Sequence, residues 1–217
     1  MDRLDSRSEA SVSAELASRV RALLQASIDL KKEVMDQHSD VIVRMAEKVS
    51  SSLQNGGKVL LCGNGGSAAD AQHLATELLI RLRSGVDRDG LPALALATDA
   101  SSITACGNDY SFDHYYERMT NTLGRPGDVL IGITTSGQSE NIVRALSAAQ
   151  RKGMVSMGLL GGDGGRAVEH CDIALVVPSA ITGRVQEAHI AIGHALMELV
   201  EDLLLDAGYL KRRVEAR

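Results

Sequence analysis

Residues 59–81 read VLLCGNGGSAADAQHLATELLIR, and this stretch decides the fold. Its first four residues are an apolar run that predicts a buried strand, and the apolar spacing after the glycines predicts a helix. A strand, a glycine loop and a helix in this order are typical of a parallel α/β sheet. The stretch therefore predicts an α/β fold and marks the loop at 63–66 as a candidate ligand-binding site.

Short apolar runs alternate with helical patterns through the rest of the chain. The runs lie at 58–62, 91–97, 128–134, 155–160 and 172–178. They predict a five-stranded parallel sheet whose right-handed crossovers place helices on both faces. We therefore expect one α/β domain, a three-layer doubly wound sheet, followed by a long last helix that ends at Gly208.

The region before the first strand is polar over residues 1–10, which we expect to be flexible. Neither proline nor glycine occurs between residues 11 and 55, and apolar residues at helical spacing predict two helices within 11–57. These N-terminal helices either cover the core or form an oligomer interface. The α/β domain itself should span 58–208, and a C-terminal tail should follow at 209–217.

Composition excludes several classes of function. The 217 residues carry a formal net charge of −5 and no basic cluster apart from KRR at 211–213, so we expect no nucleic-acid partner. No signal-peptide pattern and no run of eighteen apolar residues occurs, which predicts a cytoplasmic protein that does not span a membrane. Cys62, Cys106 and Cys171 are odd in number and far apart, so we interpret them as buried thiols.

The glycine loop resembles a nucleotide-binding motif in spacing alone. GNGGSA at 63–68 satisfies the G-x-G-x-x-A pattern, which also requires a ribose-binding acid about twenty residues onward, at the end of the second strand. Here that strand is expected to end near Asp99, over thirty residues past Gly63. No Gly-Lys-Ser/Thr follows either, so the loop is not a P-loop. A nucleotide is therefore disfavoured.

A sugar phosphate fits the loop better. The helix after Gly66 would present backbone N–H groups and its positive dipole end to an anion, and Ser67 is a candidate N-cap. Two further loops should reach the same sheet edge: CGNDYSF at 106–112 and TTSGQSE at 134–140. The second offers hydroxyl groups that either bind a phosphate or only cap a helix: Thr134, Thr135, Ser136 and Ser139.

His73 and Glu77 are four residues apart, which places them on one face of the predicted helix. Such a pair either binds a divalent ion such as zinc or forms an ordinary hydrogen bond. The last helix adds Gln186 and His194, about 80° apart around the helix and roughly 12 Å apart along it. Ligands so far apart suggest a site shared between subunits. Two more residues lie off that face and are interpreted as structural or solvated: Glu187 and His189.

The motifs CGNGGSAADAQH, GNDY, GDVLIGITTSGQS and VQEAHIAIGH, in this order, resemble the SIS (sugar isomerase) domain and specifically the phosphoheptose isomerases. The similarity covers about residues 36–207. It implies a flavodoxin-like fold and a homotetrameric enzyme that interconverts sedoheptulose 7-phosphate and D-glycero-D-manno-heptose 7-phosphate through an enediol. That reaction is the first step toward the ADP- or GDP-heptose of bacterial lipopolysaccharide and related glycans.

The resemblance also implies roles for individual residues. One zinc ion (Zn2+) per subunit would be held by His73, Glu77, Gln186 and His194. The acid/base pair would be Glu77 and His194. Substrate contacts are implied for a larger set: Asn64, Gly65, Gly66, Ser67, Asn108, Asp109, Thr134, Thr135, Ser136, Ser139 and Gln186.

Two other functions stay open. Some SIS-domain proteins resemble this sequence but act as binding partners, such as one that associates with the bacterial replication initiator. That branch departs at the positions of Glu77 and His194, which this sequence retains. An isomerase activity on another sugar phosphate is also compatible. Gly183 and Thr76 stand where some phosphoheptose isomerases have acids, and these departures bear on substrate preference or rate.

Overall fold

The computed structural model describes residues 9–211. The predicted flexible segment 1–10 and the predicted tail 209–217 lie mostly outside these residues. Within them, strands and helices alternate from Val59 onward, as the apolar runs predict. The fold class is α/β.

The sheet has five parallel strands, as predicted. They are β1 (Val59–Gly63), β2 (Ala93–Ala95), β3 (Val129–Thr134), β4 (Val155–Gly161) and β5 (Ile173–Val177). Their order across the sheet is β2-β1-β3-β4-β5, the doubly wound order of flavodoxin-like folds. Val59 of β1 pairs with Ala93 of β2 on one side and with Val129 of β3 on the other. β1, β3 and nearly all of β4 are buried because helices cover both faces of the sheet.

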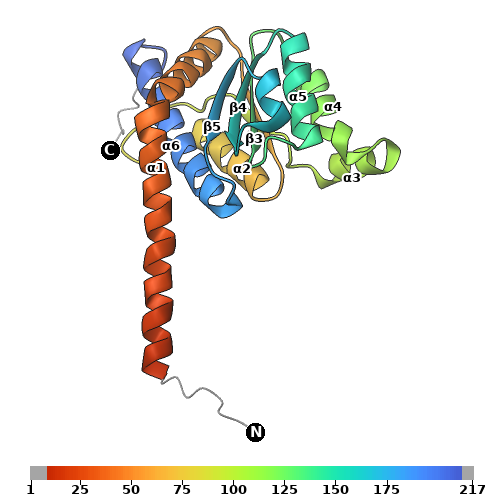
Figure 1. Ribbon diagram of the computed structural model, residues 1–217. Helices are drawn as coiled ribbons and strands as arrows, with labels where there is room; N and C mark the ends of the chain where they lie inside the picture. The colour runs from red at the N-terminus through yellow and green to blue at the C-terminus, as the bar shows by residue number, and fades with distance from the viewer. Residues whose placement is uncertain (1–8, 212–217) are drawn as a thin grey trace.

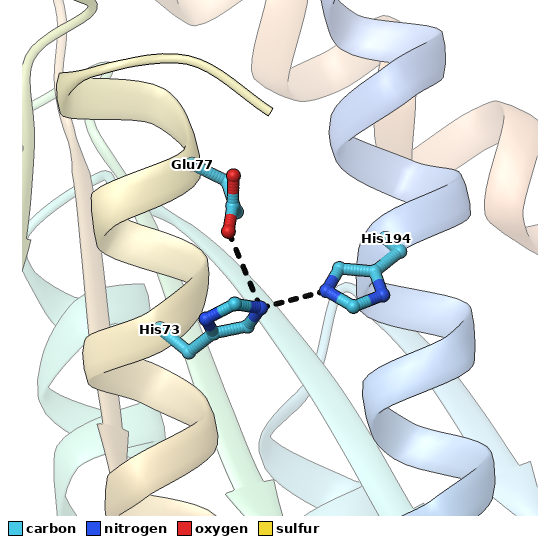
Figure 2. Close-up of side chains that lie close together, drawn as sticks. All are labelled: His73, Glu77 and His194. Carbon is cyan, nitrogen blue, oxygen red and sulfur yellow. Dashed lines mark hydrogen bonds and ion pairs between the residues drawn. The ribbon is translucent and has the colours of Figure 1, made fainter. Parts of the chain in front are cut away.

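Six α-helices and two short 3-10 helices lie within the described residues. They are α1 (Glu9–Gln54), α2 (Gly66–Leu79), α3 (Ala100–Asp109), η1 (Phe112–His114), α4 (Tyr115–Leu123), α5 (Glu140–Arg151), η2 (Gly165–His170) and α6 (Thr182–Asp206). α1, α2 and α6 cover one face of the sheet, and α3, α4 and α5 cover the other (Figure 1). This arrangement confirms the three-layer prediction. α2 and α6 lie side by side on the first face (Figure 2).

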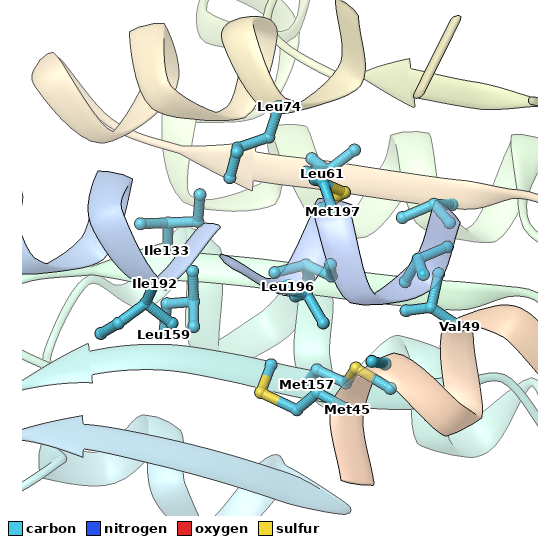
Figure 3. Close-up of a cluster of buried hydrophobic side chains, with 14 of the residues drawn as sticks. Met45, Val49, Leu61, Leu74, Ile133, Met157, Leu159, Ile192, Leu196 and Met197 are labelled. Carbon is cyan, nitrogen blue, oxygen red and sulfur yellow. The ribbon is translucent and has the colours of Figure 1, made fainter. Parts of the chain in front are cut away.

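The larger of the two cores lies between the sheet and the layer of α1, α2 and α6 (Figure 3). Leu61, Ile133 and Leu159 come from three neighbouring strands, Met45 comes from α1 and Leu196 comes from α6, and none of these side chains is exposed. Burying one such side chain contributes about 1.5–3 kcal/mol to folding. The core therefore fixes α2 and α6 against the sheet and against each other.

The N-terminal segment differs from the prediction. One helix of 46 residues, α1, replaces the two expected over 11–57, because no proline or glycine interrupts its backbone hydrogen bonds. The chain leaves this helix at Gly56, whose φ is 79°. Figure 1 shows the N-terminal half of α1 projecting from the body of the protein. Apolar side chains on that half are 40–59% exposed: Val12, Leu16, Val20, Leu23, Leu24 and Ile28.

The cysteines are buried or partly buried thiols, as predicted. Cys62 and Cys106 are buried, Cys171 is partly buried, and all three are free. Burial raises the pKa of the Cys62 thiol and raises the pKa of Cys171 to about 12, so both stay protonated at neutral pH. In the described part of the chain, each helix is too short or too polar to cross a membrane.

Candidate active site

The carboxyl ends of β1 and β3 form the switch point of the sheet. β1 leads into α2 on one face, whereas β3 leads into α5 on the other. Ligands of doubly wound sheets bind in the crevice between such diverging connections. Gly63, the last residue of β1, pairs with Ile133 of β3, so the two predicted binding loops begin side by side.

The glycine loop turns sharply into α2. Gly65 has a φ of 55° and is the N-cap, so the helix begins at Gly66. Ser67 is therefore not the N-cap, contrary to expectation: it lies inside the first turn and is 4% exposed. The difference arises because a glycine at positive φ starts the helix earlier than a serine cap would. The N–H groups of Ser67 and Ala68 donate to the carbonyl groups of Asn64 and Gly65, and the positive end of the helix dipole favours an anion beside this turn.

A reciprocal amide pair ties the two binding loops together. Asn64 Nδ2 donates to Asn141 Oδ1, and Asn141 Nδ2 donates to Asn64 Oδ1, each at 2.9 Å. Asn141 lies in the first turn of α5 and is 3% exposed. The pair occupies the side chain of Asn64, which was predicted to contact substrate. Sequence reasoning missed Asn141, because nothing in its spacing links it to a residue 77 positions earlier.

The second loop offers hydroxyl groups at the start of α5. Thr134 Oγ1 lies 3.3 Å from Ser139 Oγ, and Ser136 Oγ accepts the N–H of Gln138 at 3.2 Å. Ser139 is the N-cap residue, yet its side chain makes no capping hydrogen bond. Helix capping alone therefore does not explain the hydroxyl groups, which favours the other interpretation, that they bind a ligand.

A second glycine turn supports the hydroxyl loop from behind. Gly137 has a φ of 64°, and a Cβ there would lie 2.0 Å from the carbonyl oxygen of Gly164. The Gly137 carbonyl accepts the N–H of Ala167 at 2.9 Å. The loop is thus packed against the turn before η2 with no room for a side chain, and its shape is fixed before any ligand binds.

Gln186, in the first turns of α6, lies over the glycine loop. A Cβ added at Gly66 would fall 2.2 Å from Gln186 Nε2, so the amide rests on the loop backbone. This contact joins α6 to the glycine loop, and the substrate contact of Gln186 stays a prediction. The role of Gln186 as a metal ligand stays a prediction.

His73, Glu77 and His194 come together between α2 and α6 (Figure 2). His73 Nε2 lies 3.2 Å from Glu77 Oε1 and 2.7 Å from His194 Nε2. The two imidazole rings are nearly perpendicular, with centroids 5.0 Å apart. Two ring nitrogens at this separation need a proton between them or a cation that both bind. The structure thus joins three of the four predicted metal ligands.

A close approach of the two helices makes this cluster possible. Gly193 precedes His194, and a Cβ there would fall 2.6 Å from Leu74, the residue after His73. Glycine at this position lets the backbones approach until the two histidines meet. The three residues belong to one chain, and the sharing of the whole site between subunits stays a prediction. Gln186 and His194, on whose separation that expectation was based, lie eight residues apart on α6.

The cluster lies at the boundary between core and solvent. Glu77 is 9% exposed, whereas the side chain of His73 is 46% exposed. Burial disfavours a charged carboxylate, and a cationic partner compensates for the lost hydration. The three ligand atoms lie within 4.8 Å of one another, a span that one divalent ion can bridge. Two imidazoles and a carboxylate form a donor set that suits zinc.

Asp70 is a site residue that sequence reasoning missed. It lies on α2 one turn before His73, and its Oδ2 atom is buried without a hydrogen-bond partner among the described residues. Burial raises the pKa of Asp70, and the nearby His73 and His194 counteract that rise. Asp70 thus acts on the two histidines through its charge, and no hydrogen bond of its Oδ2 atom orients them. The three-residue spacing of Asp70 and His73 was the signal available in the sequence.

Asn108 and Asp109 lie in the last turn of α3, not in a loop after the second strand as expected. The helix forms because Asp99 caps it, accepting the N–H of Ser101 at 3.0 Å, and because Gly107 is accommodated within it. Ten helical residues carry this end of α3 about 15 Å from its start. Asn108 Nδ2 donates to Asp109 Oδ1 at 2.8 Å, and both side chains are exposed. Their contact with substrate stays a prediction.

His189 and Glu187 are structural or partly solvated, as expected. His189 is 1% exposed, and its Nε2 lies 3.0 Å from the carbonyl oxygen of Leu160. Burial lowers the pKa of His189 to about 4, so the ring stays neutral at physiological pH. Glu187 forms an ion pair with Arg184 at 2.8 Å.

Comparison with known proteins gives a consistent result. The family model of the SIS domain matches residues 23–161. The chain is 54% identical over 179 residues to the phosphoheptose isomerase of Chlorobaculum parvum, a match that covers 82% of this chain and 86% of that protein. Phosphoheptose isomerase GmhA from Neisseria gonorrhoeae superposes with a TM-score of 0.80 at 43% identity, covering 86% of this chain and 99% of that one. A phosphoheptose isomerase from Francisella tularensis superposes with a TM-score of 0.81 at 38% identity, covering 86% and 98%.

Proposed function

Because this chain belongs to the SIS-domain family, and within it to the phosphoheptose isomerases, we propose that it interconverts sedoheptulose 7-phosphate and D-glycero-D-manno-heptose 7-phosphate. One observation carries the proposal. The cluster of His73, Glu77 and His194 lies on the same two helices whose first turns meet at the switch point, beside a hydroxyl-rich loop that suits a phosphate.

The proposed substrate extends along α2. Its phosphate occupies the cradle at the starts of α2 and α5, and His73 lies seven residues beyond Gly66, about 10 Å along the helix. A seven-carbon sugar can bridge such a separation, with its phosphate at one end and its reacting carbons at the other. Phosphate contacts are proposed for the backbone or hydroxyl groups of Gly65, Gly66, Ser67, Thr134, Thr135, Ser136 and Ser139. Gln186 is proposed to contact the sugar, and Asn64, Asn108 and Asp109 remain predicted contacts.

The reaction requires proton transfers at carbon and at oxygen. A base removes a proton from C1 of the ketose, and the electrons of that C–H bond form the C1–C2 double bond of the enediol. The carbon proton is then delivered to C2. Over the reaction O2 gains a proton, because it changes from a carbonyl to a hydroxyl group, and O1 loses one, because it becomes the aldehyde oxygen. We assign the carbon proton to Glu77, whose burial keeps bulk water away, and the oxygen protons to His194, whose Nε2 is within hydrogen-bond distance of His73.

The residues present fit the proposed zinc ion, one per subunit. His73, Glu77 and His194 would hold it, with Gln186 as the predicted fourth ligand, and the unpaired Asp70 oxygen nearby is typical of the surroundings of such a site. When bound, the ion supplies a positive charge that polarises the substrate carbonyl. A metal-bound carboxylate is a weaker base, and a ring nitrogen bound to a metal accepts no proton, so metal binding competes with the proton-transfer roles of both Glu77 and His194.

The two departures from some relatives leave the cluster intact. Gly183 lies in the first turn of α6, and a Cβ there would meet open space. Thr76 is exposed and donates its hydroxyl to the carbonyl of Gln72 at 3.0 Å. Both departures therefore act, in this proposal, on substrate preference or rate and not on the assembly of the cluster.

The proposal includes a homotetramer in the cytoplasm that supplies heptose for bacterial glycans. Support for assembly comes from the projecting half of α1, whose exposed apolar side chains follow the helical repeat. Free thiols support a reducing compartment. Sedimentation equilibrium should give the mass of four chains, and Leu16→Glu combined with Leu24→Glu should lower it. A parent protein that sediments as a monomer would contradict the assembly.

Incubation with sedoheptulose 7-phosphate tests the function directly. Proton NMR should detect D-glycero-D-manno-heptose 7-phosphate, a chelator should reduce its formation, and added zinc should restore it. Other ketose phosphates, assayed in parallel, test whether sedoheptulose 7-phosphate is the preferred substrate. If none is converted by folded protein, with or without added zinc, the isomerase proposal fails and a non-catalytic binding function is favoured. Preference for another sugar phosphate would overturn the proposed substrate but not the proposed isomerase activity.

A further inference from the structure

The C-terminal end of α2 is held by a residue from the following loop. The last carbonyl groups of a helix lack partners within the helix, and α2 has no basic residue in its own last turn. Arg88 supplies the missing donors. Its Nη2 donates to the carbonyl of Glu77 at 2.8 Å, and its Nη1 donates to the carbonyl of Leu78 at 3.0 Å. The backbone carbonyl that receives the first bond belongs to the same residue as the proposed base.

The same guanidinium reaches α6. Arg88 Nε donates to Glu201 Oε2 at 2.6 Å, and the two side chains are only 1% and 2% exposed. Glu201 follows His194 by seven residues, or about two turns, so both project from one face of α6. One planar group thus bonds to the Glu77 backbone on α2 and to the face of α6 that carries His194.

Stability alone gives a weak reason for this arrangement. The desolvation of a buried ion pair often offsets its Coulombic attraction, so a well-packed apolar pair would serve folding equally well. A guanidinium has a rigid fork of donors with fixed directions, which a flexible ammonium lacks. The contacts of Arg88 use that rigidity, because its Nε and its two terminal nitrogens bond to different elements.

We propose that Arg88, locked onto Glu201, is a positioning residue that sets the separation of Glu77 and His194 across α2 and α6. The inference rests on the proposed function of these two residues. Arg88 itself contacts neither substrate nor metal in this account. A displacement of reacting groups by about 1 Å can lower a rate about a hundredfold, and altered support of a metal ligand lowers metal affinity about 10- to 100-fold.

Arg83 provides a matched control. Its Nε donates to the other oxygen of the same carboxylate, Glu201 Oε1, at 2.6 Å, and its Nη2 bonds to Asp202. Its side chain is 29% exposed, and both of these bonds run to α6. Arg83→Lys and Arg88→Lys therefore make the same chemical change around one carboxylate, but only the second removes the fork that holds the Glu77 carbonyl.

The experiment compares the parent, Arg88→Lys and Arg83→Lys in turnover of sedoheptulose 7-phosphate, in cobalt(II) binding followed by visible absorption, and in thermal unfolding. We expect Arg88→Lys to lower kcat by about 10- to 100-fold with KM within about twofold, and to weaken cobalt binding about tenfold. In Arg83→Lys, kcat and cobalt affinity should both stay within about threefold of the parent values. Should Arg88→Lys not fold, Glu201→Gln replaces it, with the same directions expected.

Equal losses of kcat and cobalt affinity in the two lysine variants would overturn the proposal, as would parent-like values in Arg88→Lys. A parent protein that binds no cobalt would also contradict the proposal, because Arg88 is proposed to position Glu77 and His194, which are predicted metal ligands. A parent that binds cobalt but does not convert the heptulose phosphate would overturn the proposed function alone. In that case the relative cobalt affinities still decide the role of Arg88.

Discussion

The two ends of the candidate site are built differently. The reacting end, between α2 and α6, consists of titratable side chains that meet at 2.7–3.2 Å. The anchoring end, at the starts of α2 and α5, consists of backbone, hydroxyl groups and amides held in shape by glycines. Each end follows from its task, because proton transfer needs groups that change charge, whereas holding a phosphate needs fixed donors that do not.

The difference predicts that substitutions at the two ends separate kinetically. A change at the reacting end should alter kcat, since it removes an interaction made in the transition state. A change at the anchoring end should alter KM, since it weakens substrate and transition state alike. The variants below test this separation.

Glu77→Gln should have the largest effect. The amide keeps the shape of the side chain but cannot accept the carbon proton, so kcat should fall by about a thousandfold while the fold is preserved. Steady-state kinetics and circular dichroism measure the two properties. Glu198→Gln makes the same change at an exposed position of α6 and should keep the parent rate. Turnover of Glu77→Gln within tenfold of the parent would remove Glu77 from the mechanism.

Gly137→Ala should disturb the anchoring end. The new Cβ would lie 2.0 Å from the Gly164 carbonyl oxygen, so the hydroxyl loop must shift. We expect KM to rise about tenfold, with cobalt binding unchanged. Gly162→Ala is the control, because Gly162 also has a positive φ, 67°, but a Cβ there meets open space. A larger loss of kcat than of apparent affinity in Gly137→Ala would contradict the division between the two ends.

His189, which lies outside the candidate site, should make the free energy of unfolding depend on pH. Its pKa is lowered to about 4 in the folded protein, while the unfolded value is near 6.5, so the folded state favours the neutral ring. The stabilisation is complete above pH 6.5 and is lost as pH falls toward 4. Between pH 7 and pH 5 this residue should remove about 2 kcal/mol of unfolding free energy.

Urea unfolding of the parent and of His189→Gln at both pH values checks this contribution. Glutamine retains an N–H donor for the Leu160 carbonyl but does not titrate. The variant should therefore lose about 2 kcal/mol less than the parent on acidification. An identical pH dependence in the two proteins would show that His189 is not buried in its neutral form.

The Asn64–Asn141 pair should have the smallest effect. A double-mutant cycle with Asn64→Ala and Asn141→Ala should give a coupling energy of about 1 kcal/mol in unfolding, because each amide satisfies the other. KM should rise a few-fold in each single variant, with kcat nearly constant. Additive effects of the two substitutions would contradict the pairing.

The strands were predictable because buried parallel strands are continuous apolar runs that glycine or proline bounds. The length of α1 was also readable from its lack of glycine and proline, but the helical pattern was divided into two helices. The end of α3 was misassigned because GNDY resembles a turn, whereas the Tyr110 N–H donates to the Cys106 carbonyl at 3.0 Å and the helix continues through Asp109.

The site was predictable where its residues lie close in sequence. His73 and Glu77 follow from their four-residue spacing, but their meeting with His194 depends on the close approach of two helices at Gly193, which is a property of packing. Asn141 and Arg88 act through partners 77 and 113 positions away, Asn64 and Glu201. No spacing rule connects such residues, so a single sequence does not reveal them.

Exchange of the C1 protons of sedoheptulose 7-phosphate with deuterated solvent tests the central claim most directly. Proton NMR should show exchange and isomerisation by the parent protein, and both should fall together, by about a thousandfold, in Glu77→Gln. That result would establish Glu77 as the group that moves the carbon proton. Exchange or isomerisation at the parent rate in Glu77→Gln would contradict the account.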